Sequence, residues 1–204
     1  ASISAHERTG ARLGHMLLGA ASRGWLPLGC ALAVLLSERD PLSPQQAGCD
    51  LMRRLEWLRQ QGPGAASRDH DERDGQRRQM RRLENQLLQQ VREASGALPA
   101  PSPCRAVAVQ PESEQAIAAQ LLCWAYPERI ALNRGKGDGR FLLRGGRGAH
   151  LHPSDPLAAA HALAVPASMG KDSRPGFCSR YICLPHLWKP WAQARASGWS
   201  KPAG

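Results

Sequence analysis

Five cations gather on two glycine-rich stretches, GKGDG and GGRG, in the second half of the chain. Such stretches are typical of tight turns between short strands. Cationic side chains on turns can contact phosphates, and contacts of this kind ignore base sequence and weaken as salt rises. The pattern therefore predicts a nucleic-acid-binding site made of Arg134, Lys136, Arg140, Arg144 and Arg147.

A second interpretation of these cations is open. A chain rich in alanine and arginine can place arginine on solvent faces without any ligand. The net charge of +10 and the pI near 10.1 favour a polyanionic partner. Arg129, which follows Pro127 and Glu128 at a helix exit, can instead be a structural ion-pair partner.

No catalytic constellation is evident in the chain. Gly170-Lys171 lacks a glycine five positions before Gly170 and is followed by Asp172, so it is not a GxxxxGK[ST] phosphate-binding loop. The run from Asp71 to Asp74, DERD, resembles a magnesium-binding acidic motif, but polar residues precede it where a buried strand is needed. It is predicted to be a solvated charge run on a loop.

Histidine and cysteine do not complete a metal site at the usual ligand spacings. His150 and His152 are predicted to share one strand face, with His161 downstream, and no acidic or cysteine partner joins them. A second weak cluster consists of Cys178, Cys183 and His186. We predict no metal site and no cofactor in this chain.

The remaining bulk features favour a cytoplasmic protein. No apolar run approaches the roughly 20 residues that cross a bilayer, no membrane partner is expected, and the N-terminus lacks the pattern of a signal peptide. The cysteines are predicted to be buried small side chains or free thiols in a reducing compartment. They are Cys30, Cys49, Cys104, Cys123, Cys178 and Cys183.

The first half of the chain is predicted to be helical. Leu13, Met16, Leu17 and Ala20 repeat at helical spacing, and the next apolar run is too continuous for a surface helix. We expect two helices within 12–36, then helices over 47–60 and 76–93, with an exposed loop over 61–75. Residues 1–94 would form a helical bundle.

The second half is predicted to be a β-unit behind a linker. Four prolines mark residues 95–111 as the linker, which has room for a short strand over 107–109. A helix over 112–125 precedes strands over 129–133, 140–144 and 149–152, which fit a small OB-like barrel. The fold class is therefore α+β, with the β-unit over 112–165 and an irregular tail over 166–204.

Tryptophan and paired arginine on the predicted helices are expected to be structural. Trp25, Trp57 and Trp124 lie on helices or at their ends, where packing is commoner than base stacking. The pairs at 77–78 and 81–82 lie mostly off the apolar stripe of their helix, and are predicted to be a solvated face. A nucleic-acid contact by these pairs is the alternative.

Three blocks resemble the C-terminal half of the HrpB-type ATP-dependent helicases, a bacterial branch of the DExH-box group. They are RLGHMLLGAASRGWLPLGCALAVLLSERDPL (12–42), LMRRLEWLRQQ (51–61) and LLCWAYPERIALNRGKGDGRFLLRGGRGAHLHPSDPLA (121–158). The resemblance covers residues 12–165. It implies a ratchet-like helical bundle followed by an OB-like domain, with single-stranded RNA or DNA as the partner.

The resemblance also implies what a longer protein would do. The family hydrolyses ATP with Mg²⁺ on two RecA-like motor domains, and these would be partners of this chain, which carries neither a Walker A nor a DExH motif. Whether the chain itself is an enzyme is thus open. The tail beyond Val165 is unlike the family, and a frameshifted or truncated gene product is the hypothesis for it; an uninterrupted frame on resequencing would contradict it.

Two alternative functions are open at this point. The chain can be a stand-alone, non-catalytic basic adaptor for nucleic acid or protein, or an inactive gene fragment. The pattern of residues does not separate RNA from DNA.

Overall fold

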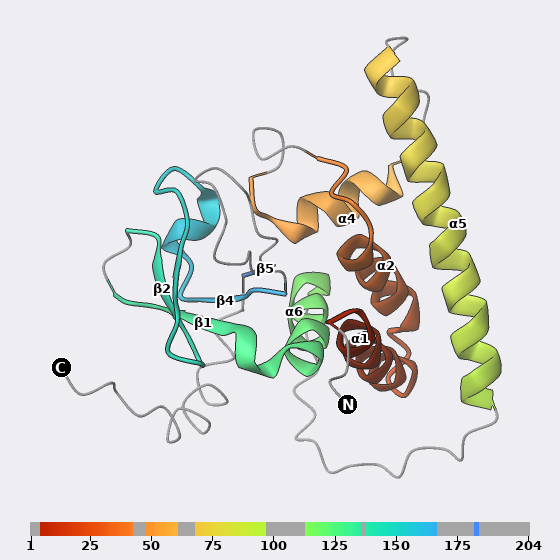
Figure 1. Ribbon diagram of the computed structural model, residues 1–204, viewed down its shortest axis with the longest axis horizontal. Helices are drawn as coiled ribbons and strands as arrows, with labels where there is room; N and C mark the ends of the chain where they lie inside the picture. The colour runs from red at the N-terminus through yellow and green to blue at the C-terminus, as the bar shows by residue number, and fades with distance from the viewer. Residues whose placement is uncertain are drawn as a thin grey trace.

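A computed structural model describes residues 5–42, 48–60, 68–96, 113–135, 138–166 and 182–183. The side chains of 5–9, 68–72, 95–96 and 182–183 are outside this description. The fold is α+β, as predicted. In Figure 1 the sheet lies on one side and the helices on the other, with α6 between them.

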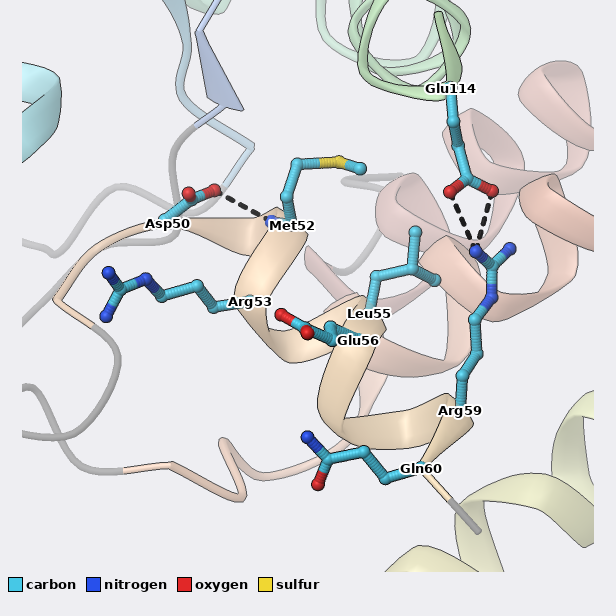
Figure 2. Close-up of a pocket in the computed structure, with 8 residues that line it drawn as sticks. All are labelled: Asp50, Met52, Arg53, Leu55, Glu56, Arg59, Gln60 and Glu114. Carbon is cyan, nitrogen blue, oxygen red and sulfur yellow. Dashed lines mark hydrogen bonds and ion pairs between the residues drawn. The ribbon is translucent and has the colours of Figure 1, made fainter.

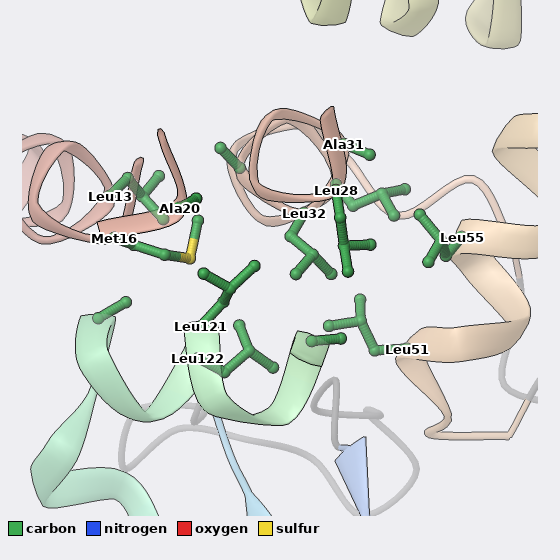
Figure 3. Close-up of a cluster of buried hydrophobic side chains, with 14 of the residues drawn as sticks. Leu13, Met16, Ala20, Leu28, Ala31, Leu32, Leu51, Leu55, Leu121 and Leu122 are labelled. Carbon is green, nitrogen blue, oxygen red and sulfur yellow. The ribbon is translucent and has the colours of Figure 1, made fainter. Parts of the chain in front are cut away.

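Helix α2 (Leu26–Ser37) is central among the helices. It packs against α1 (Ala5–Ala21), α4 (Leu51–Arg59), α5 (Arg68–Gly96) and α6 (Glu114–Ala125). Its residues from Leu28 to Leu35 are all buried, which fits the continuous apolar run in the sequence. Figure 3 shows leucines from α1, α2, α4 and α6 meeting in this core.

Two helices begin at side-chain caps. Asp50 Oδ1 accepts a hydrogen bond from the N–H of Met52 at 2.8 Å, so α4 begins after residue 50 instead of at 47. Ser113 Oγ accepts one from the N–H of Ala116 at 3.2 Å at the start of α6. Each cap satisfies an N–H that has no partner within its own helix.

The predicted loop over 61–75 is wrong for residues 68–75, which belong to α5. The run from Asp71 to Asp74 is therefore helical. Acidic side chains stabilise the first turns of a helix through its dipole, and Asp74 also pairs with Arg77 at 3.0 Å. The glycine and the mixed charges of this stretch are typical of a loop, so the sequence pattern did not predict a helix here.

The sheet is antiparallel, with five described strands in the order β3-β2-β1-β4-β5. Two 3-10 turns, η1 (Pro127–Arg129) and η2 (Pro156–Ala159), lie between its elements. The strands are β1 (Ile130–Asn133), β2 (Arg140–Leu143), β3 (Gly148–His150), β4 (Ala162–Ala164) and β5 (Ile182–Cys183).

Three of these strands are close to the predicted ones, and two were not predicted. The three residues of β4 are too short for a period, and β5 lies within the tail that was expected to be irregular throughout. A closed barrel needs β3 to pair with β5, and no such pairing occurs among the described strands. The OB-like identity therefore stays a prediction.

The two faces of the sheet belong to two different cores. Ile130, Ala162 and Ala164 pack in the same cluster as the helices, while Phe141 and Leu163 pack in a second cluster beneath η2. The predicted boundaries of the bundle, linker and β-unit stay predictions. Nevertheless, α6 and one sheet face share a core with α1 and α2.

Candidate nucleic-acid interface

The register of β1, β2 and β3 places Arg134, Arg140 and His150 in one row across three strands. Arg140 is the Cα partner of His150, and Arg134 donates its backbone N–H to the carbonyl of Arg140 at 3.0 Å. Opposed residues in an antiparallel sheet point to the same face and neighbouring strands lie about 5 Å apart. All three side chains are exposed. We call this set the basic row.

The face that carries the basic row is the one whose other half packs on α6. Leu132, Leu142 and Gly148 form the next row along it, because Leu142 is the partner of both Leu132 and Gly148. On β1 and β4 this face is covered by helices. On β2 and β3 the same face carries exposed Arg140 and His150, half-buried Leu142, and Gly148, which has no side chain.

Arg144 and Arg147 lie at the other end of β2. Arg144 follows β2 on the same face as Arg140, four residues and about 13 Å along the strand. The N–H of Leu143 donates to the carbonyl of Arg147 at 2.8 Å, which closes the β2–β3 turn. Both side chains are exposed. The predicted cations thus form two groups at the two ends of β2, while Lys136 lies outside the described residues.

Asp138 limits the charge of the basic row. Its Oδ2 lies 3.4 Å from Arg140 Nε, and its Oδ1 accepts the backbone N–H of Arg140 at 3.2 Å. The Arg140 side chain nevertheless remains 65% exposed, so a phosphate can reach its outer nitrogens. Exposed ion pairs of this kind contribute little to stability, and a phosphate can compete with the carboxylate.

His150 lies opposite Arg140 in the basic row and was not among the predicted site residues. His150 and His152 were predicted to share one strand face. That prediction is wrong, because β3 ends at His150, and His152 Nδ1 lies 2.6 Å from Ser154 Oγ. No group of three metal-binding side chains occurs among the described residues. The position of His150 opposite Arg140 follows from the register of β2 and β3, which no local sequence pattern gives.

Arg129 is a structural residue. Its Nη1 donates to the carbonyl of Pro166 at 2.9 Å, and its guanidinium lies 5.5 Å from the ring of Tyr126. Its Nε is 3.6 Å from Glu128, which also pairs with Arg12. These contacts join β1 to the end of β4, so Arg129 supports the sheet.

The arginine pairs of α5 divide into a structural and a solvent-exposed set. Arg81 donates to the carbonyls of Leu58 and Arg59, at 2.9 and 2.7 Å, and so caps the end of α4. Arg77 lies 4.8 Å over the ring of the buried Trp57. The predicted solvated face is correct for Arg78 and Arg82 and wrong for these two.

A groove of about 570 Å³ between α4 and the start of α6 is a separate feature (Figure 2). Arg59 pairs with Glu114 across it at 2.7 Å. Its lining carries the carboxylates of Asp50, Glu56 and Glu114 beside two arginines. This mixture of charges makes it a poor site for a polyanion.

The prediction of free or buried cysteines is confirmed for two of the three cysteines whose side chains are described and wrong for Cys49. Cys30 and Cys123 are free and buried, whereas Cys49 is disulfide-bonded. Burial, aided by the charge of Glu84, raises the pKa of Cys30 to about 11, and burial raises the pKa of Cys123 further. The weak cluster at 178, 183 and 186 lies outside the described side chains, as does Lys171. No described helix is long and apolar enough to cross a membrane.

No protein-family model matches this chain, and no curated protein matches it. Its structure is similar to the crystal structure of the Escherichia coli DExH-box NTPase HrpB, with a TM-score of 0.54 and 22% sequence identity. The similarity covers 96% of this chain and 20% of that chain. It shows that the fold is shared with a part of that helicase-group protein, about a fifth of its length.

Proposed function

We propose that this chain is an accessory region of an HrpB-type DExH-box helicase that holds single-stranded RNA or DNA by its phosphates. The basic row carries this proposal, because it brings three exposed nitrogen-bearing side chains to one open sheet face. The likeness to a part of HrpB supports it at the level of the fold. ATP hydrolysis would reside in RecA-like domains that are separate from this sheet.

The mechanism that we propose is electrostatic guidance. Phosphates of the strand would contact Arg134, Arg140 and His150 at one end of β2, and Arg144 and Arg147 at the other. The half-buried Leu142 and the exposed Gly148 lie between the two groups. Such contacts do not read sequence, which suits a strand that has to move past the protein.

The first test measures binding of labelled single-stranded RNA and DNA by fluorescence anisotropy over a series of salt concentrations. Each phosphate contact contributes roughly 0.7 to the slope of log affinity against log salt for a single strand. Arg140→Gln should lower the affinity for every sequence alike and reduce the slope by about this amount. Arg53→Gln is the matched control, because Arg53 is exposed on α4 beside the groove carboxylates.

A second variant raises the charge of the row without adding a residue. Asp138→Asn keeps an oxygen for the N–H of Arg140 and removes the competing carboxylate. We expect tighter binding and a steeper salt slope. If neither Asp138→Asn nor Arg140→Gln changes the affinity while the chain still binds, the phosphates lie elsewhere.

A further inference from the structure

Two tryptophan rings from distant parts of the chain stack on each other at the surface of the helical core. Trp25 lies in the turn between α1 and α2, and Trp124 is near the end of α6. Their centroids are 6.1 Å apart and their planes differ by 17°. Both residues are only partly buried.

The backbone fixes Trp25 in place. Gly24 adopts φ +73, which lets α1 end in a tight left-handed turn, and the N–H of Trp25 donates to the carbonyl of Ala20 at 2.9 Å. On its other side the carbonyl of Trp25 accepts the N–H of Gly29 in α2 at 3.0 Å. A ring held in this way loses little entropy when a ligand stacks on it.

Trp124 is backed by α1. A Cβ atom on Gly19 would lie 2.8 Å from Cε3 of the Trp124 ring, so the ring rests directly on the helix backbone. Since Trp25 and Gly19 both belong to the α1–α2 hairpin, the indole of α6 is held against that hairpin.

Arg23 adds an unpaired cation to the rings. Its guanidinium lies 4.5 Å from the Trp124 centroid and 5.9 Å from that of Trp25. Arg23 is exposed and makes no ion pair with the acidic side chains of the described residues. Its Nη1 donates to the hydroxyl of the neighbouring Ser22 at 3.5 Å, and packing of the rings does not require a cation at this exposed position.

We propose that Trp25, Trp124 and Arg23 form a stacking site for a base of a single strand, with Arg23 contacting the adjacent phosphate. Aromatic side chains beside arginine bind successive bases in this way without sequence preference. This site rests on the proposed function and extends it from phosphates to bases. Ile130 lies six positions after Trp124, so the Cα atom of Trp124 is at most about 20 Å from the start of β1.

The test compares an ordinary oligonucleotide with an abasic one of the same length, which has the same phosphates and no bases. Trp124→Leu should weaken binding of the ordinary strand by about 5- to 100-fold and leave the abasic strand and the salt slope unchanged. Arg23→Gln should instead weaken both strands and reduce the slope by roughly 0.7. Far-UV circular dichroism and thermal melting establish that each variant is folded.

A measurement on the unaltered chain covers the case in which Trp124→Leu does not fold. Photocrosslinking with a 5-iodouracil-containing single strand, followed by peptide mass mapping, should label the peptide that holds Trp25 or Trp124. Labelling confined to other peptides would overturn the stacking site. A different result would contradict the phosphate proposal, namely that neither oligonucleotide binds or that the affinity for both does not depend on salt.

Discussion

The carboxylate of Asp155 accepts the backbone N–H of Cys49 at 3.1 Å, across 106 positions of the sequence. The same carboxylate accepts the N–H of Leu157 at 2.9 Å and so begins η2. One side chain thereby joins the turn before α4 to the segment that covers the second core of the sheet.

Replacing Asp155 should therefore weaken both connections at once. For Asp155→Ala we expect a loss of about 1–2 kcal/mol in the free energy of unfolding, the size of a lost helix cap. Urea denaturation followed by circular dichroism measures it. Ser154→Ala is the neighbouring control, since among the described residues its hydroxyl bonds to the exposed His152, and equal losses in the two variants would contradict the linking role.

Arg54 should be the charged residue to which stability is most sensitive. It is fully buried and donates to both oxygens of Asp40, at 3.0 and 2.9 Å, and to the carbonyls of Asp50 and Gly48. Arg54→Met strands these acceptors, and we expect a loss of roughly 3 kcal/mol in denaturant melts.

These acceptors require several N–H donors held in the planar geometry of one guanidinium. Arg54→Lys keeps the charge but offers a single ammonium, so it should recover less than half of that loss. The exposed neighbour Arg53 supplies the control, because Arg53→Met should change stability by no more than about 0.5 kcal/mol. Similar losses at 53 and 54 would argue against the buried network.

Asp50 should give stability a pH dependence in the acidic range. Burial raises the pKa of this carboxyl, and the charge of Asp155 adds to that, against the lowering by Met52 N–H and nearby arginines. The folded state then holds the proton more tightly than the unfolded chain, so this group's contribution to stability falls as pH rises from the ordinary aspartate range through the raised pKa.

Asp50→Asn removes the titration and keeps an oxygen for the cap. We expect equal or higher stability at pH 7 and a flatter dependence over the pH range that begins at the ordinary aspartate pKa and extends upward through the raised one. Asp50→Ala instead loses the cap, at about 1 kcal/mol. Melts of the three proteins across this range provide the comparison. If Asp50→Asn is as unstable as Asp50→Ala, ionised Asp50 does not lower the stability as expected.

Arg81 and Arg82 are adjacent in the sequence and should behave differently. Arg81→Met removes the donors to the last carbonyls of α4, and we expect a loss of about 1 kcal/mol in stability. Arg82→Met, which is exposed, should leave stability within about 0.5 kcal/mol. If Arg82→Met alone weakens single-strand binding, α5 joins the interface; thermal melts and anisotropy on both variants decide this.

The thiols of Cys30 and Cys123 should resist alkylation in the folded protein. Both are buried, and a pKa of about 11 at Cys30 leaves almost no reactive thiolate at pH 8. Iodoacetamide labelling with peptide mass mapping should modify them only after denaturant is added. Rapid labelling under native conditions would mean that the helical core opens readily.

Most helices and three strands follow from local patterns. The apolar run of α2 and the stripe of α1 carry periodic signals, and the glycine turns define β2 between them. The first two turns of α5 carry no apolar stripe in the sequence RDHDERDG, so the sequence pattern did not predict them as helix. The pairing of β4 and β5 depends on partners far away in the chain, which no local period records.

The candidate site was predicted as a set of charges but without its arrangement. The glycine-rich turns in the sequence pointed to Arg134, Arg140, Arg144 and Arg147. That these residues lie in two groups, one at each end of β2, is known only from the register of the sheet. Arg77 and Arg81 seemed equivalent to Arg78 and Arg82 because a helix period does not reveal which side meets α4. The Trp25–Trp124 stack joins segments about a hundred residues apart and has no local signal.

The core shared by the helices and the sheet has a mechanical consequence. Ile130, Ala162 and Ala164 pack in the same interior as α6, α1 and α2. A close-packed interior transmits displacement instead of absorbing it. If a bound nucleic-acid strand displaced Arg140, the displacement would therefore pass through the sheet into α6. It would then reach the α1–α2 hairpin, where the stacked tryptophans lie.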